Sequence, residues 1–142
     1  MNAQLTANAS TTVKASRNKV WDALVNPVAI KEYMFGAEVE SEWRKGSPIV
    51  WRGTWKGKPY EDKGEVLVIE PEKKLQYTHF SPMSGDPDKP EFYHTVTVEL
   101  QDTGQATRLS LSQDNNPTIE ARDHSAKNWT MMLEGLKKFV ER

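Results

Sequence analysis

The sequence predicts an α+β protein in which a curved antiparallel β-sheet carries one long C-terminal helix packed across it and two short helices near the N-terminus. The last 25 residues, 118–142, repeat apolar side chains at steps of three and four, as an amphipathic helix does. The chain before them consists mostly of short alternating apolar and polar segments separated by turn residues, which is typical of strands that pair with their chain neighbours. The sheet is therefore expected to wrap the final helix.

The predicted C-terminal helix has one broad apolar face with Trp129 near its middle. This face is formed by Ala126, Trp129, Met132, Leu133, Leu136, Phe139 and Val140. Met131 falls on the opposite, polar side and is predicted to be largely exposed. A face of this width fits either a packed core helix or a helix that covers a ligand cavity.

The sequence of the N-terminal part predicts one strand and two short helices. In the segment 5–13 the odd positions face inward and are mostly small, which leaves room for something opposite them. Ser16 is a plausible N-cap for a helix over Arg17–Val25, and a second short helix is expected near 28–33.

Six further strands are predicted between the short helices and the long one. They lie at 37–43, 49–55, 63–69, 75–80, 92–100 and around 109–111. Gly53, between two tryptophans, suggests a bulge or bend in its strand. Three prolines and a glycine in 81–91 indicate a loop.

Length and composition narrow the possible functions. The 142 residues suit one domain, 1–142. A net charge of -1, from 19 basic and 20 acidic residues, gives no overall field to attract nucleic acid or an anionic membrane, so neither is expected as a partner. The absence of cysteine excludes disulfides, thiolate metal sites and thiol nucleophiles. The first ten residues lack the features of a signal peptide, and we expect a soluble cytoplasmic protein.

Two histidines are predicted to enter an aromatic pocket. Tyr77 and His79 share one face of a strand, and Phe92 and His94 share one face of the next. Imidazole donates or accepts a hydrogen bond and titrates near neutrality, so it can orient a ligand carbonyl or phenol. The alternative is that both histidines lie at the sheet rim or are satisfied by neighbouring hydroxyls.

Aromatic and apolar side chains complete the predicted ligand site, although ordinary core packing is an equal alternative for the tryptophans. The predicted site consists of Trp51, Trp55, Tyr77, His79, Phe92, His94, Val96, Trp129, Met132 and Leu133. Ser112, Asp114 and His124 lack a nucleophile elbow or an oxyanion-hole motif, so no catalytic residue is predicted. Without cysteine or a third histidine on that face, no metal is expected, and no cofactor is implied.

Several short motifs, in this order and spacing, resemble a known superfamily. They are Val-Trp-Asp-Ala-Leu at 20–24, Gly-Glu-Val at 64–66, Glu-Pro at 70–71, Leu-Gln-Tyr-Thr at 75–78 and the helix 129–136. The chain resembles the START-like, Bet v-like helix-grip (SRPBCC) superfamily. Its nearest branch is that of homologues of the heat-shock-protein ATPase activator (AHSA-like). The resemblance implies a bent sheet gripping the C-terminal helix, with a cavity between them for lipids, polyketides or other apolar molecules.

Three functions follow as expectations. The leading one is non-catalytic binding of a small, mostly apolar molecule that is lipid-, polyketide- or flavonoid-like. Among these, flat aromatic compounds are the ligands expected first. The second is a polyketide cyclase or aromatase in which His79 or His94 exchanges protons with the substrate. The third is a stress-related, chaperone-interacting protein. Full-length activators carry a separate N-terminal domain that this chain lacks, so chaperone interaction is the least expected.

Overall fold

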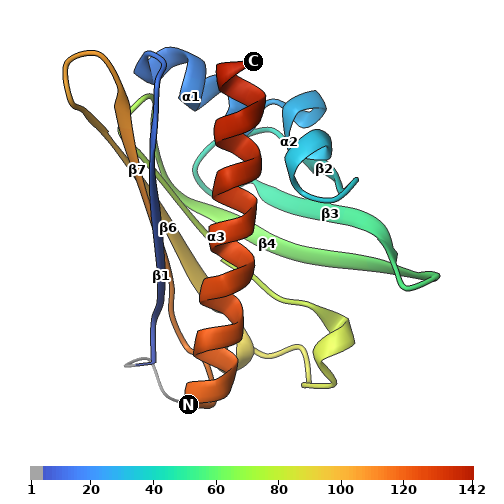
Figure 1. Cartoon of the computed structure of the whole chain (residues 1–142). Helices are drawn as coiled ribbons and strands as arrows, with labels where there is room; N and C mark the ends of the chain where they lie inside the picture. Colours follow the sequence, from blue (N-terminus) through green and yellow to red (C-terminus); the bar gives the residue numbers. More distant parts are fainter. Residues whose placement is uncertain (1–4) are drawn as a thin grey trace.

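The computed structural model describes residues 5–142 and confirms the α+β class, with a long C-terminal helix lying across a curved antiparallel sheet (Figure 1). Residues 1–4 of the predicted domain lie outside the described part. The seven strands are β1 (Ala7–Val13), β2 (Glu38–Ser41), β3 (Pro48–Trp55), β4 (Lys58–Glu70), β5 (Lys74–His79), β6 (His94–Asp102) and β7 (Thr107–Gln113). The helices are α1 (Arg17–Val25), α2 (Pro27–Tyr33) and α3 (Ile119–Glu141), with short 3₁₀ turns at Pro82–Ser84 and Pro90–Phe92.

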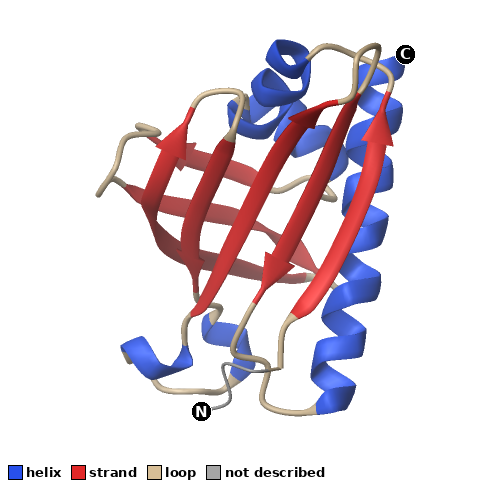
Figure 2. Cartoon of the chain, turned by 90° about the vertical axis from the view of Figure 1, so that its left-hand side faces the viewer, coloured by secondary structure: helices blue, strands red, loops and turns tan. Residues whose placement is uncertain are grey.

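The strands form one open sheet in the order β1-β7-β6-β5-β4-β3-β2, and every neighbouring pair is antiparallel. The sheet is so strongly curved that the strands at its two ends run in clearly different directions (Figure 2). Its register shifts between Val66 and Val68 of β4, as at a β-bulge, and bulges increase local twist and bend. The concave face produced in this way receives α3.

Of the bulge or bend predicted at Gly53, the bulge is absent. β3 and β4 pair in continuous register, with Gly53 opposite Tyr60. The lack of a side chain at Gly53 leaves room for the Tyr60 ring, because a Cβ atom would lie 2.6 Å from the Tyr60 hydroxyl oxygen. β4 also begins at Lys58 rather than at residue 63, because Lys56 and Gly57, with φ of 51° and 80°, form a two-residue hairpin turn.

Helix α3 buries the predicted apolar face against the sheet. Met132, Leu133 and Leu136 are buried, and Trp129 is half-buried. Met131 is 56% exposed, as predicted. Thr118 caps the helix by accepting a hydrogen bond from the Ala121 N–H at 3.0 Å.

The other end of α3 is joined to the first strand by hydrogen bonds. Lys137 Nζ donates to the Thr12 carbonyl oxygen at 2.6 Å, and the Lys14 N–H donates to Glu141 Oε2 at 2.7 Å. These bonds fix the helix along β1, so the space that remains between helix and sheet lies toward β3, β4 and β5.

The two short helices form as predicted, with differences at their caps and at one strand. Ser16 precedes α1 in extended conformation but makes no side-chain capping hydrogen bond, whereas Asn26 Oδ1 accepts from the Val28 N–H at 2.9 Å and caps α2. The strand predicted from residue 92 starts at His94, because Phe92 belongs to the 3₁₀ turn that Pro90 begins. Within residues 5–142, no helix has the length and hydropathy needed to cross a membrane.

Candidate functional site

A cavity of about 140 Å³ lies between the inner face of β3 to β5, the segment after α2 and the middle of α3. It is lined by Met34, Phe35, Ala37, Trp51, Tyr60, Asp62, Tyr77, His79 and Trp129. Five of these nine residues carry phenyl, phenol or indole rings, and one carries a carboxylate. A space of about 30 Å³ that shares Met34, Trp51 and Tyr77 continues toward Met132 in the core.

The aromatic walls are held at fixed inclinations. The Trp51 ring lies 5.4 Å from the Tyr77 ring at 46°, and 5.1 Å from the His79 ring at 68°, measured between centroids. Trp129 Nε1 donates a hydrogen bond of 3.0 Å to Oε1 of the buried Gln113, which orients the indole of α3. The rings therefore enclose the cavity from several sides without depending on a ligand.

One polar pair stands in this apolar wall. His79 Nε2 lies 2.9 Å from Asp62 Oδ2, and the two side chains are 25% and 16% exposed. An ionised carboxylate only accepts hydrogen bonds, so Nε2 carries the hydrogen, and Nδ1 of a neutral His79 is an acceptor. Among the described residues neither His79 Nδ1 nor Asp62 Oδ1 has a hydrogen-bond partner, although both atoms are buried. Unsatisfied buried polar atoms are uncommon and are expected at functional sites.

Tyr77 contributes a further polar atom. Burial raises the pKa of Tyr77 well above its usual value, so its hydroxyl keeps the proton at neutral pH. Its oxygen has no hydrogen-bond partner within residues 5–142. Tyr77 thus lines the cavity as a neutral phenol, beside Asp62 and His79.

His94 lies beside His79 but faces a different space. The two residues are register partners on β6 and β5, and their rings stack with 6.3 Å between centroids. His94 Nδ1 donates to the Asp114 carbonyl oxygen at 2.9 Å. Its groove, of about 710 Å³, lies between the loop before β6 and the start of α3. The groove is lined by Ser84, Asp86, Glu91, Phe92, His94, Asn115, Asn116, Pro117, Ala121 and Ser125. The prediction that both imidazoles enter one pocket is therefore corrected, because His79 lines the cavity whereas His94 lines the groove.

The ten predicted site residues fall into five groups. Four line the cavity, namely Trp51, Tyr77, His79 and Trp129. Met132 lines the adjoining small space, while Phe92 and His94 line the groove. Val96 and Leu133 are buried in the core. Trp55 is 56% exposed near the turn between β3 and β4 and does not line the cavity, because this hairpin extends past α3 (Figure 1).

Sequence reasoning missed five of the nine lining residues, namely Met34, Phe35, Ala37, Tyr60 and Asp62. Asp62 and Tyr60 belong to the first part of β4, whose polar sequence did not indicate a strand. The two-residue turn at Lys56-Gly57 was the signal that could have found them, since it pairs the residues after it with those before it. Phe35, with φ of 58° and 68% exposure, follows α2 at the cavity rim.

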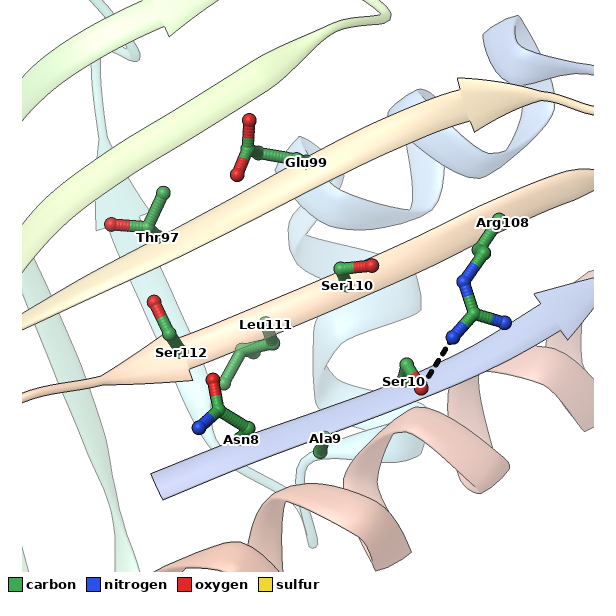
Figure 3. Close-up of a pocket in the computed structure, with 9 residues that line it drawn as sticks. All are labelled: Asn8, Ala9, Ser10, Thr97, Glu99, Arg108, Ser110, Leu111 and Ser112. Atoms are coloured by element: carbon green, nitrogen blue, oxygen red, sulfur yellow. Dashed lines mark hydrogen bonds between the residues drawn. The ribbon is translucent and has the colours of Figure 1, made fainter. Parts of the chain in front are cut away.

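A hollow of about 400 Å³ on the opposite face of the sheet has different chemistry (Figure 3). It is lined mainly by small polar side chains of β1, β6 and β7, and Arg108 Nη2 donates to Ser10 Oγ at 3.1 Å. No aromatic ring is among its described lining residues, so it offers little apolar surface to a ligand. Among residues 5–142, no group of three or more His, Cys, Asp or Glu side chains is placed to hold a metal.

Comparison with known proteins identifies the family of the chain and finds solved structures with a similar fold. A family model described as Activator of Hsp90 ATPase homolog 1-like protein matches residues 14–141. The solution structure of ChR145 from Cytophaga hutchinsonii is 53% identical, with a TM-score of 0.86, over 99% of this chain and 97% of that one.

Two further solved structures are similar at lower identity. The crystal structure of CalU16 from Micromonospora echinospora is 20% identical, with a TM-score of 0.75, over 95% of this chain and 75% of that one. The solution structure of the Aha1 dimer from Colwellia psychrerythraea is 20% identical, with a TM-score of 0.75, over 96% of each chain. These two show the fold alone. No curated protein matches the chain.

Proposed function

Because the chain belongs to the family of activator of Hsp90 ATPase homolog 1-like proteins, we propose that it binds a small, mostly apolar molecule between the sheet and α3. The observation that carries this proposal is the aromatic cavity, which the protein's own side chains leave unfilled. Asp62 and His79 line it, and each also holds one buried polar atom without a hydrogen-bond partner among the described residues. Apolar pockets with a few convergent polar groups are the usual form of small-molecule sites.

The cavity volume limits what fits inside. About 140 Å³ is close to the roughly 150 Å³ of an engineered apolar cavity that binds benzene, so the cavity accepts one ring or a group of that size. A flavonoid-, polyketide- or lipid-like ligand would extend further, past the His79 and His94 rings and into the groove. The function proposed is non-catalytic, which means that the ligand is carried, stored or sensed.

Proton transfer is a second candidate function, and the Asp62–His79 pair favours it. A carboxylate that holds one imidazole nitrogen fixes the tautomer and leaves the other nitrogen as a base, which suits a cyclase- or aromatase-type reaction. Chemical conversion of a bound compound would distinguish this candidate from simple binding.

Binding can be tested with a panel of flat aromatic and other apolar compounds. We expect quenching of tryptophan emission, since Trp51 and Trp129 line the cavity, and a rise in melting temperature. At a hundredfold excess over Kd the stabilisation is about 2.7 kcal/mol. Ala37→Leu, at a buried wall position, should fill the cavity and abolish both effects, whereas Trp55→Phe, outside the cavity, should preserve them. A panel that produces neither effect would overturn the proposal.

A further inference from the structure

The cavity lining is rich in aromatic rings and contains one carboxylate. The faces of phenyl, phenol and indole rings are negative, and such rings come from β3, β4, β5, α3 and the segment after α2. The only charged side chain in the described lining, apart from an ionisable histidine, is the carboxylate of Asp62. No lysine or arginine is part of that lining, so nothing in it attracts an anion.

Asp62 also lacks a full counter-charge. Its ion-pair partner among the described residues is His79, which is charged only when protonated. Asp62 Oδ1 is buried without a hydrogen bond. A carboxylate withdrawn from water in this way is costly unless a positive group compensates it. A cation in the cavity would supply that compensation.

We propose that the cavity is an aromatic cage for a small organic cation of the quaternary ammonium class. The inference rests on the proposed function and specifies the chemistry of the bound group. A quaternary ammonium presents methyl groups to the aromatic rings and spreads its charge over them, so it loses little hydrogen bonding on leaving water. A primary ammonium has three N–H donors to satisfy, so it would lose more hydrogen bonding on leaving water.

The wall geometry is set before a ligand binds. Trp51 is fixed against Tyr77 and His79, and Trp129 is fixed by its bond to Gln113. Tyr60 lies over Gly53, where no side chain competes for the space. A preformed cage avoids the entropy cost of ordering side chains on binding. Its volume of about 140 Å³ suits a nitrogen with four small substituents.

The test compares choline with 3,3-dimethylbutan-1-ol, its neutral isostere, in which carbon replaces the charged nitrogen. Titrations followed by tryptophan emission and backbone amide shifts, at matched ionic strength, should give choline at least about tenfold higher affinity. Asp62→Asn should remove most of this preference. Glu99→Gln removes a carboxylate from the opposite face of the sheet and should change neither affinity.

Equal affinities for choline and the alcohol in the wild-type protein would contradict the cage proposal. A preference for choline that is unchanged in Asp62→Asn would contradict it as well. The wild-type comparison decides the matter even if Asp62→Asn fails to fold. If the aromatic panel binds while choline does not, the cage fails and the proposed function stands. If the panel, choline and the alcohol all fail to bind, both proposals fall.

Discussion

Tyr33 and Tyr77 are both buried, yet only one of them uses its hydroxyl for structure. Tyr33 donates a hydrogen bond of 2.7 Å to the Ala23 carbonyl oxygen and so joins α2 to α1, whereas the Tyr77 hydroxyl lacks a partner within the described chain. Burial raises the pKa of both phenols, and the nearby Tyr77 raises that of Tyr33 further. The two buried phenols therefore differ, since only that of Tyr33 is held in place by a hydrogen bond.

These raised pKa values predict that stability falls in alkaline solution. An unfolded tyrosine ionises near pH 10, while the folded protein holds both phenols neutral beyond it. The unfolded state thus loses protons first, so the stabilisation is fully present below about pH 10 and is lost as pH rises from there through the folded pKa values. Thermal scans from pH 8 to 11 should show this fall. Tyr77→Phe removes one titrating group without a hydrogen bond and should make the fall shallower; an unchanged slope would contradict the assignment.

The residues of the site differ in how readily a sequence could predict them. Alternation within β5 placed Tyr77 and His79 on one inner face, because adjacent residues of a strand point to opposite sides. Asp62 meets His79 only through the pairing of β4 with β5, and its neighbours in sequence carry no apolar alternation. A contact made by strand pairing cannot be found from periodicity within either strand.

At the scale of elements, the close approach of β4 and β5 depends on Gly64. A Cβ atom there would lie 1.7 Å from the Thr78 carbonyl oxygen, a backbone atom that cannot turn aside. This contact explains the glycine of the Gly-Glu-Val motif. It also holds the β4 segment that carries Asp62 beside His79.

Gly64→Ala should therefore lower the free energy of unfolding by at least about 2 kcal/mol, since the backbones must separate to admit a methyl group. Urea denaturation measures the loss. Glu65→Ala, at the neighbouring exposed position, should stay within about 0.5 kcal/mol of the wild-type protein. If Gly64→Ala were as stable as the wild-type protein, β4 and β5 could move apart at this point without any loss in the free energy of unfolding.

Most elements could be predicted because each has a strong period of its own. The apolar face of α3 and the alternation of β6 identified them, and only their ends differ by one or two residues. The first half of β4 escaped prediction because it extends beyond α3 with little apolar contact, so its sequence is polar on both faces. Where tertiary burial is absent, the pattern that identifies a strand is absent too.

For the whole molecule, the even balance of 19 basic and 20 acidic residues argues against electrostatic steering toward a large partner. We expect that the chain does not stimulate the ATPase of an Hsp90 chaperone when the two are mixed in equal amounts. A coupled ATPase assay with an authentic activator as positive control measures this. Stimulation above the chaperone's own rate would favour the chaperone-interacting function over ligand binding.

The bonds between α3 and the first strand also bear on self-association. β1 is an outer strand, and a free strand edge is a template for adding another chain. Here the Thr12 carbonyl and the Lys14 N–H are already taken by Lys137 and Glu141 of the last helical turns, which also pair with each other at 2.9 Å. Helix α3, which lines the cavity through Trp129, thus also hinders edge-to-edge pairing with another chain at this end of the sheet.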